Sequence, residues 1–195
     1  MKNIYIILIL IFSFTIFSCA KKSDTSSTTT TTEVEGTWLT NCFQSGDYYH
    51  IHSATVSGTD VVVKYEWHTD SGCSTDYVMW EETYDSLSIG DEVTFSDATK
   101  GHQFTLNVVN LKLTPQIASV VSALNTDNSC GYSDWALNTA KDHTGKTCGS
   151  TAYPVANTSI QGLYNLVGNN LFISTLSTTG SYPTVVSTSI TYVKQ

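Results

Sequence analysis

Aromatic side chains and one carboxylate alternate along two neighbouring stretches of the chain, near residues 59–69 and 76–88. In an extended strand, residues two apart share a face, so each stretch presents one row of side chains. The rows consist of Val61, Val63, Tyr65 and Trp67, and of Val78, Trp80, Glu82 and Tyr84. Aromatic walls around a single polar anchor are typical of a small-molecule site. We therefore interpret the following as candidate ligand-binding residues: Tyr65, Trp67, Trp80, Glu82 and Tyr84.

Glu82 is the charged member of these two rows. If the rows face the inside of a barrel, its carboxylate needs a partner or a ligand to offset the cost of burial. The alternative is that a β-bulge turns Glu82 towards water, and then the aromatic side chains are ordinary core.

Three histidines raise the question of metal binding. His50 and His52 lie two apart in a predicted strand, so both project from one face, and His68 falls on the next strand. Such a set could bind zinc. Because His50 and His52 alternate with Tyr49 and Ile51, we favour an exposed polar face instead, and we predict neither a metal site nor a cofactor.

The sequence lacks the common enzyme signatures. Gly145-Lys146-Thr147 resembles the end of a phosphate-binding loop, but Ala140 occupies the position of its first glycine. No G-x-S-x-G elbow, H-E-x-x-H helix or EF-hand loop occurs. We therefore predict a protein without enzymatic activity and without catalytic residues.

The first 19 residues have the pattern of a bacterial lipoprotein precursor. An apolar run from Ile4 to Phe17 follows Met1-Lys2-Asn3, and it is shorter than the roughly 20 residues that span a bilayer. The run closes with the lipobox-like sequence Ile16-Phe17-Ser18-Cys19. We predict a signal peptide over residues 1–18, lipidation of Cys19 and a Ser/Thr-rich tether over residues 19–35.

The chain is acidic, so its surface is not expected to bind a membrane, and the acyl chains on Cys19 are the expected membrane attachment. The chain has 17 acidic residues against 9 lysines and no arginine, and its formal net charge is −8. Such a surface repels nucleic acid and anionic headgroups, so we predict no nucleic-acid partner. Ala20 stands where aspartate would signal inner-membrane retention, which favours the outer membrane of a bacterial cell envelope.

Four further cysteines lie in the body of the chain: Cys42, Cys73, Cys130 and Cys148. In an oxidising compartment they can pair in three ways, of which sequential pairing is the simplest. The alternative is four buried thiols. No C-x-x-C pair occurs and the spacings fit no zinc template, so we favour two disulfides.

Residues 36–195 are expected to form one all-β domain. Two-residue alternation rich in Val, Thr, Tyr and Trp, broken at short intervals by turn residues, is typical of antiparallel strands. A long meander usually closes into a barrel because closure removes its edges. We predict an antiparallel up-and-down β-barrel with strands near 36–43, 47–57, 59–69, 76–88, 91–97, 102–113, 162–168, 170–177 and 183–193.

One short helix is expected to interrupt this pattern, over residues 115–125. Thr114 can cap it, and Pro115 suits its first turn. Its apolar side chains follow helical spacing: Ile117, Val120, Val121 and Leu124.

Several motifs resemble one known group of proteins. Gly36-Thr37-Trp38 is similar to the Gly-x-Trp signature of lipocalins, and Tyr65-x-Trp67-x-x-Asp70-Ser71-Gly72-Cys73 closes a later hairpin. With Trp135, Lys141-Asp142-x-x-Gly145-x-x-Cys148 and the terminal hairpin at 163–173, these motifs resemble the lipocalin-like domain of the adenomatosis-polyposis-coli-down-regulated family and its bacterial lipoprotein relatives. The resemblance covers most of residues 36–193.

This resemblance implies a lipocalin/calycin-like cup that takes an apolar ligand, with Cys42 paired to Cys73. The arginine that covers the signature tryptophan in lipocalins is missing, since this chain has none. We therefore expect a lipid-anchored binder of a small apolar or amphipathic molecule. The alternative is a structural or adhesive surface lipoprotein with a filled core and no such ligand.

Overall fold

The computed structural model describes residues 32–195. The predicted signal peptide, the lipidation site Cys19 and most of the predicted tether lie outside the described residues. Within residues 32–195, no helix is long and apolar enough to cross a membrane.

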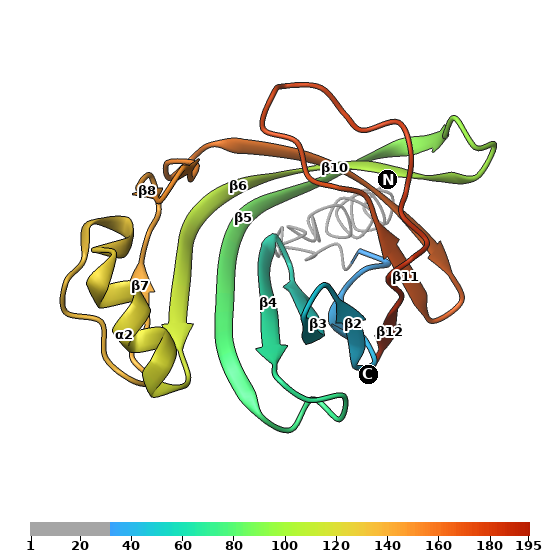
Figure 1. The fold of residues 1–195 in the computed structure, drawn as a ribbon. Helices are drawn as coiled ribbons and strands as arrows, with labels where there is room; N and C mark the ends of the chain where they lie inside the picture. The colour runs from blue at the N-terminus through green and yellow to red at the C-terminus, as the bar shows by residue number, and fades with distance from the viewer. Residues whose placement is uncertain (1–31) are drawn as a thin grey trace, which may run out of the picture. The chain divides into compact units, whose positions relative to one another are not determined.

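Antiparallel strands form a closed barrel, as the alternation predicted (Figure 1). β1 pairs with β3 on one side and with β12 on the other, so the ring has no free edge. In the order in which they pair, the eight strands of this ring are β1 (Gly36–Leu39), β12 (Tyr192–Lys194), β11 (Asn170–Ile173), β10 (Ser159–Val167), β6 (Lys100–Pro115), β5 (Asp76–Thr94), β4 (Asp60–His68) and β3 (Tyr48–Ser57).

Short strands extend the ring or lie apart from it. β2 (Phe43–Ser45) pairs with β3, and β7 (Lys141–Asp142) pairs with β6. β8 (Thr147–Cys148) and β9 (Thr151–Ala152) form a separate two-stranded sheet.

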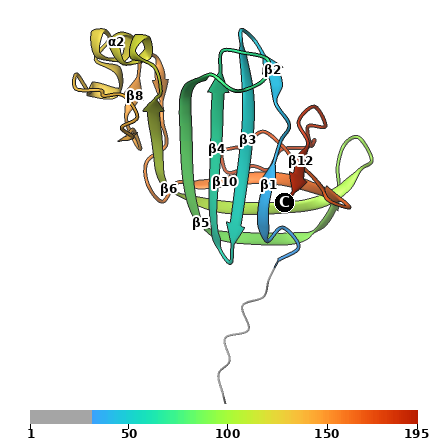
Figure 2. The ribbon, with the colours of Figure 1, turned by 90° about the horizontal axis from the view of Figure 1, so that it is seen from below.

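The long strands β5 and β6 bend strongly along their length (Figure 2). The predicted strands 76–88 and 91–97 are one strand, because pairing with β6 continues through three register shifts between Thr83 and Glu92. Ser86, with φ at 56°, takes up part of this irregularity. A bulge bends a strand without ending it, so the turn-like residues here do not make a turn.

The helix α2 spans Ala118–Thr126 and begins later than predicted. Thr114 does not cap it; Thr114 and Pro115 end β6, where Pro115 pairs with Val78. Proline disfavours a helical conformation in the residue before it, so Thr114 stays extended.

α2 and the segment that follows it pack beside β5 and β6. Val121 and Leu124 of the helix join Val78, Leu113 and Trp135 in one hydrophobic cluster. The predicted Cys130–Cys148 disulfide is present and links the short helix η1 (Ser129–Gly131) to β8.

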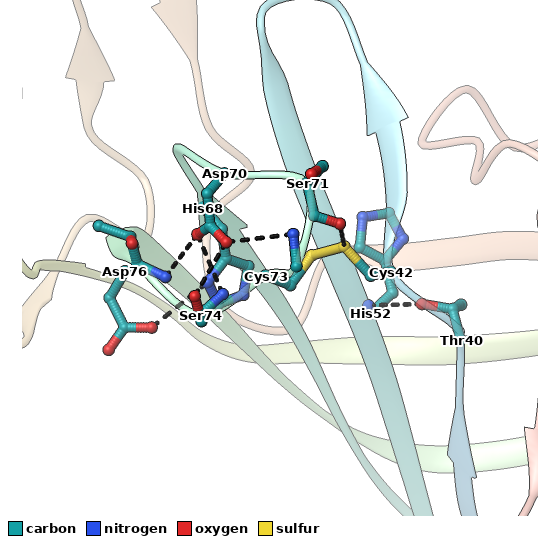
Figure 3. The surroundings of a disulfide bond; sticks show 11 residues. Thr40, Cys42, His52, His68, Asp70, Ser71, Cys73, Ser74 and Asp76 are labelled. Carbon is teal, nitrogen blue, oxygen red and sulfur yellow. Dashed lines mark hydrogen bonds and ion pairs between the residues drawn. A yellow bond between two sulfur atoms is a disulfide. The ribbon is translucent and has the colours of Figure 1, made fainter.

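The second predicted disulfide, Cys42–Cys73, joins the segment before β2 to the turn between β4 and β5 (Figure 3). Asp70 organises this turn, because its carboxylate accepts hydrogen bonds from the Ser74 hydroxyl and from the backbone N–H groups of Ser74 and Thr75. These hydrogen bonds, with that from the Ser74 side chain foremost, lower the pKa of Asp70 to about 2. The two disulfides, Cys42–Cys73 and Cys130–Cys148, confirm sequential pairing of the four cysteines.

Trp38 of β1 is fully buried in the core of the barrel. Its indole N–H donates to the Val34 carbonyl over 2.8 Å, and Lys194 Nζ lies 5.2 Å from the centroid of its ring. A lysine thus makes a cation–π contact to Trp38. Val34 itself is only 6% exposed, so the last residues assigned to the tether pack on the barrel.

The chain between β11 and β12 is irregular, whereas strands were predicted over 170–177 and 183–193. Strand structure in the second of these stretches is confined to its end, where β12 begins at Tyr192. Val186 packs with Phe95 in a small hydrophobic cluster. Leu176 and Ile190 instead line space inside the barrel.

Candidate functional site

The predicted aromatic rows lie side by side on β4 and β5. The register places Tyr65 opposite Trp80 and Val63 opposite Glu82. Directly opposite residues of an antiparallel pair share a face, so the two rows form one surface. That surface is the barrel interior, where each of the five predicted ligand-binding residues lines at least one of two cavities.

The first cavity, here called the apolar chamber, has a volume of about 290 Å³. Tyr84 and Tyr65 line it, and most of its wall belongs to the hydrophobic core around Trp38. The core of the barrel is therefore hollow. Its apolar wall includes Ala54, Val56, Val61, Val63, Leu87, Ile89, Phe104 and Leu106.

The second cavity, here called the aromatic chamber, has a volume of about 470 Å³. Tyr65, His52 and Ile190 also line the apolar chamber, so the two chambers adjoin. The full lining of the aromatic chamber is Phe43, Ser45, His50, His52, Tyr65, Trp67, Trp80, Glu82, Tyr153 and Ile190.

Two tyrosine hydroxyls hold Glu82 inside the barrel. Tyr84 donates a hydrogen bond over 2.6 Å and Tyr65 one over 3.3 Å, both to Oε2 of the carboxylate. The nearest register shift comes after Glu82, between Thr83 and Tyr84, and does not turn Glu82 outward. The interpretation in which a bulge exposes Glu82 to bulk water is therefore wrong.

Burial shapes the acid–base behaviour of this group. It raises the pKa of Glu82, and the hydrogen bonds from Tyr84 and Tyr65 oppose that rise. Burial, followed by the charge of Glu82, raises the pKa of Tyr65 well above its ordinary value and that of Tyr192 to about 12. The tyrosines therefore stay protonated at neutral pH and can donate to the carboxylate.

His50 and His52 face the barrel interior, so the predicted exposed polar face is wrong. His50 is 6% exposed, and both rings line the aromatic chamber. They share this face of β3 with Ala54 and Val56, which are core residues. Ala54 and Val56 are the local signal for this direction, but Tyr49 and Ile51 give the opposite signal for the other face of the strand.

His52 is a neutral neighbour of the tyrosines. Burial, followed by the proximity of His50, lowers the pKa of His52 to about 4. Its ring meets that of Tyr65 edge-on, with centroids 4.7 Å apart, and its Nδ1 lies 3.4 Å from the Tyr192 hydroxyl.

The third histidine does not join this pair. His68 lies opposite Tyr49 in the register, on the other face of the sheet from His50. In the part of the chain that the structure describes, no three His, Cys, Asp or Glu residues cluster in a way that could hold a metal ion.

Comparisons with known proteins do not assign this chain to a family. No protein-family model and no curated protein matches it. The site is therefore interpreted from its own geometry. Sequence reasoning identified the β4 and β5 walls of the aromatic chamber but missed Phe43, His50, His52 and Tyr153, because these come from other strands or from the irregular segment after β9.

The phosphate-loop fragment has no counterpart in this site. Thr147 of Gly145-Lys146-Thr147 begins the strand β8 rather than a helix. A phosphate-binding loop needs the N-terminus of a helix to face the anion, and this fragment does not supply one.

Proposed function

We propose that this protein is a lipid-anchored lipoprotein of the bacterial cell envelope whose barrel binds a small apolar or amphipathic molecule, without enzymatic activity. The observation that carries the binding part is the pair of adjoining chambers inside the barrel, of about 290 and about 470 Å³. The combined volume of the two chambers falls within the range of small-molecule sites. Such sites are mostly apolar and carry a few polar groups.

A purely structural lipoprotein would gain stability by filling this space. Protein interiors are close-packed, so an apolar chamber of this size is space that a structural core would be expected to fill with side chains. Ala54 and Val63 line that chamber where larger apolar side chains would reduce it. A hollow barrel therefore supports a binding role over a filled core.

The membrane part of the proposal rests on the sequence. Acyl chains on Cys19 would supply the membrane affinity, and the Ser/Thr-rich stretch after Cys19 would let the barrel stand clear of the headgroups. Ala20 after the lipidated cysteine favours the outer membrane. The likeness of the motifs to the lipocalin-like domain named above agrees with a cup that holds an apolar ligand.

A matched pair of variants on β4 tests the binding proposal. Val63 lines the apolar chamber, whereas Val62 is its neighbour on the opposite face of the strand. We expect Val63→Phe to weaken binding of the neutral fluorescent probe Nile red by at least about tenfold, since the added ring occupies the chamber. Val62→Phe should leave the affinity unchanged. Circular dichroism and cooperative unfolding of both variants show that the fold is kept.

The wild-type protein decides between the proposal and its alternative. Gentle extraction followed by mass spectrometry should detect a retained apolar molecule. A wild-type barrel that retains nothing and does not bind Nile red would instead support a structural or adhesive role.

A further inference from the structure

The wall of the aromatic chamber consists mainly of rings. Seven of its ten lining side chains are aromatic when histidine is included. Neighbouring rings meet edge to face: the centroids of His50 and Trp67 are 5.0 Å apart, and those of Phe43 and His52 are 4.9 Å apart. The faces of such rings carry negative electrostatic potential and attract cations.

The ionisable side chains that line this chamber also favour a cationic ligand over an anionic one. Glu82 is the one carboxylate in the lining of either chamber, and no lysine lines them. Tyr65 and Tyr84 both donate to Oε2, and no hydrogen bond within the described residues reaches Oε1. A cationic group beside Oε1 would compensate the buried carboxylate, whereas an anionic head would meet like charge without a counter-ion.

The type of cation follows from the side chains that make up the wall. A metal ion needs several ligands, and no suitable cluster occurs among residues 32–195. A primary ammonium has three N–H donors to satisfy. The chamber supplies acceptors in Glu82, Ser45 and the polar atoms of its tyrosines and histidines, but aromatic rings make up most of its wall. A quaternary ammonium has no N–H to satisfy and is recognised by aromatic rings.

We infer that the barrel binds an amphipathic organic cation, with a quaternary ammonium head in the aromatic chamber beside Glu82 and an alkyl tail in the apolar chamber. The shared wall residues Tyr65, His52 and Ile190 place the two chambers next to each other, which is the arrangement that the head and tail of one molecule require. This inference rests on the proposed binding function and names the ligand class for the same site.

Competition against Nile red with four single-chain ligands, each below its micelle concentration, tests the inference. The ligands share a decyl tail and differ in the head: decyltrimethylammonium, decylphosphocholine, decanol and decanoate. We expect decyltrimethylammonium to bind at least about tenfold more tightly than decanol or decanoate. Decylphosphocholine adds a phosphate to the same cation. If decylphosphocholine binds with comparable affinity, the natural ligand carries a lipid headgroup. If it does not bind, the natural ligand is a free organic cation. Both results support the inference.

Two variants connect this preference to the residues. Glu82→Gln keeps the volume of the side chain, and we expect it to reduce the affinity for decyltrimethylammonium about tenfold while decanol binds as before. Glu81→Gln is the matched control, because Glu81 lies next to Glu82 but faces outward, where it pairs with Lys64 over 3.4 Å. If Glu82→Gln does not fold, Trp67→Leu provides the same comparison through loss of a ring.

The possible failures are distinguishable. Equal affinity for the cationic and neutral ligands, preference for decanoate, or unchanged cation affinity in both Glu82→Gln and Trp67→Leu would overturn the inference and leave the proposed binding function standing. Failure of all four ligands and of Nile red itself would overturn both.

Discussion

At the scale of single residues, Glu82 is a carboxylate held away from bulk water. Its carboxylate lies inside the barrel, and its two hydrogen bonds, from Tyr65 and Tyr84, both come from neutral hydroxyls. Hydrogen bonds of this kind stabilise the anion but do not neutralise it. The free energy of folding should therefore depend on whether Glu82 is ionised.

This dependence can be measured as a difference between two proteins. Burial raises the folded-state pKa of Glu82 above its unfolded value of 4.5, so the folded state holds the proton more tightly. The resulting stabilisation is complete below pH 4.5 and is lost as the pH rises through the folded-state pKa. We expect Glu82→Gln to gain stability relative to wild type between pH 4 and pH 8 in chemical denaturation, because glutamine is uncharged at both.

The outward-facing neighbour provides the control for this measurement. Glu81→Gln should follow the wild-type pH profile or lose a little stability, since Glu81 contacts Lys64 and Lys112 at the surface. If the free energies of unfolding of wild type and Glu82→Gln change with pH in parallel, burial does not shift the pKa of Glu82.

At the scale of elements, the two disulfides fix connections that the barrel strands do not. Cys42–Cys73 bridges residues 31 apart in sequence and ties the connection before β2 to the β4–β5 turn. Cys130–Cys148 bridges residues 18 apart and holds a segment with little regular structure. Each restricts the unfolded chain by closing a loop.

Removing each bridge should therefore have a similar energetic cost and different structural effects. We expect Cys42→Ala with Cys73→Ala, and separately Cys130→Ala with Cys148→Ala, to lower the free energy of unfolding by about 3 to 4 kcal/mol each, as measured by urea denaturation. The second pair should also loosen residues 129–148 in hydrogen exchange and leave Nile red binding intact. Unchanged unfolding of either double variant would mean that its bridge is not formed in solution.

The bend in β5 explains why strand boundaries were harder to predict than strand type. Gly90 lies at the predicted break between strands 76–88 and 91–97, but the irregular backbone of this stretch is absorbed as bulges within one strand. Whether such residues end a strand depends on the partner strand, which a local pattern does not contain. Here β6 pairs across the whole stretch and keeps it continuous.

At the scale of the whole molecule, the acyl chains on Cys19 are the proposed source of membrane affinity. We expect Cys19→Ala to release the protein from membranes or to leave an uncleaved precursor, as measured by fractionation and by metabolic labelling with a fatty acid. Cys42→Ala with Cys73→Ala, which keeps Cys19, is the control and should still be labelled. Wild-type protein that is soluble and carries no label would contradict the anchor.

The sequence by itself determined the all-β class and the shared face of the β4 and β5 rows, and it favoured two sequentially paired disulfides. These properties depend on local information: the two-residue period of a strand, and cysteine number with spacing. The same period places His50 and His52 on one face of β3. It leaves open which face is inside, since both faces of that strand carry mixed polar and apolar residues.

Only the tertiary structure decided the inward direction of His50 and His52, the end of β6 at Pro115 and the hollow between the strands. Each depends on residues distant in sequence: closure of β1 onto β12 turns one face of β3 inward, and pairing with β5 keeps Pro115 extended. A cavity is the space left when side chains from many elements do not meet. The physical reason is that period and spacing are properties of a segment, whereas enclosure is a property of the closed ring.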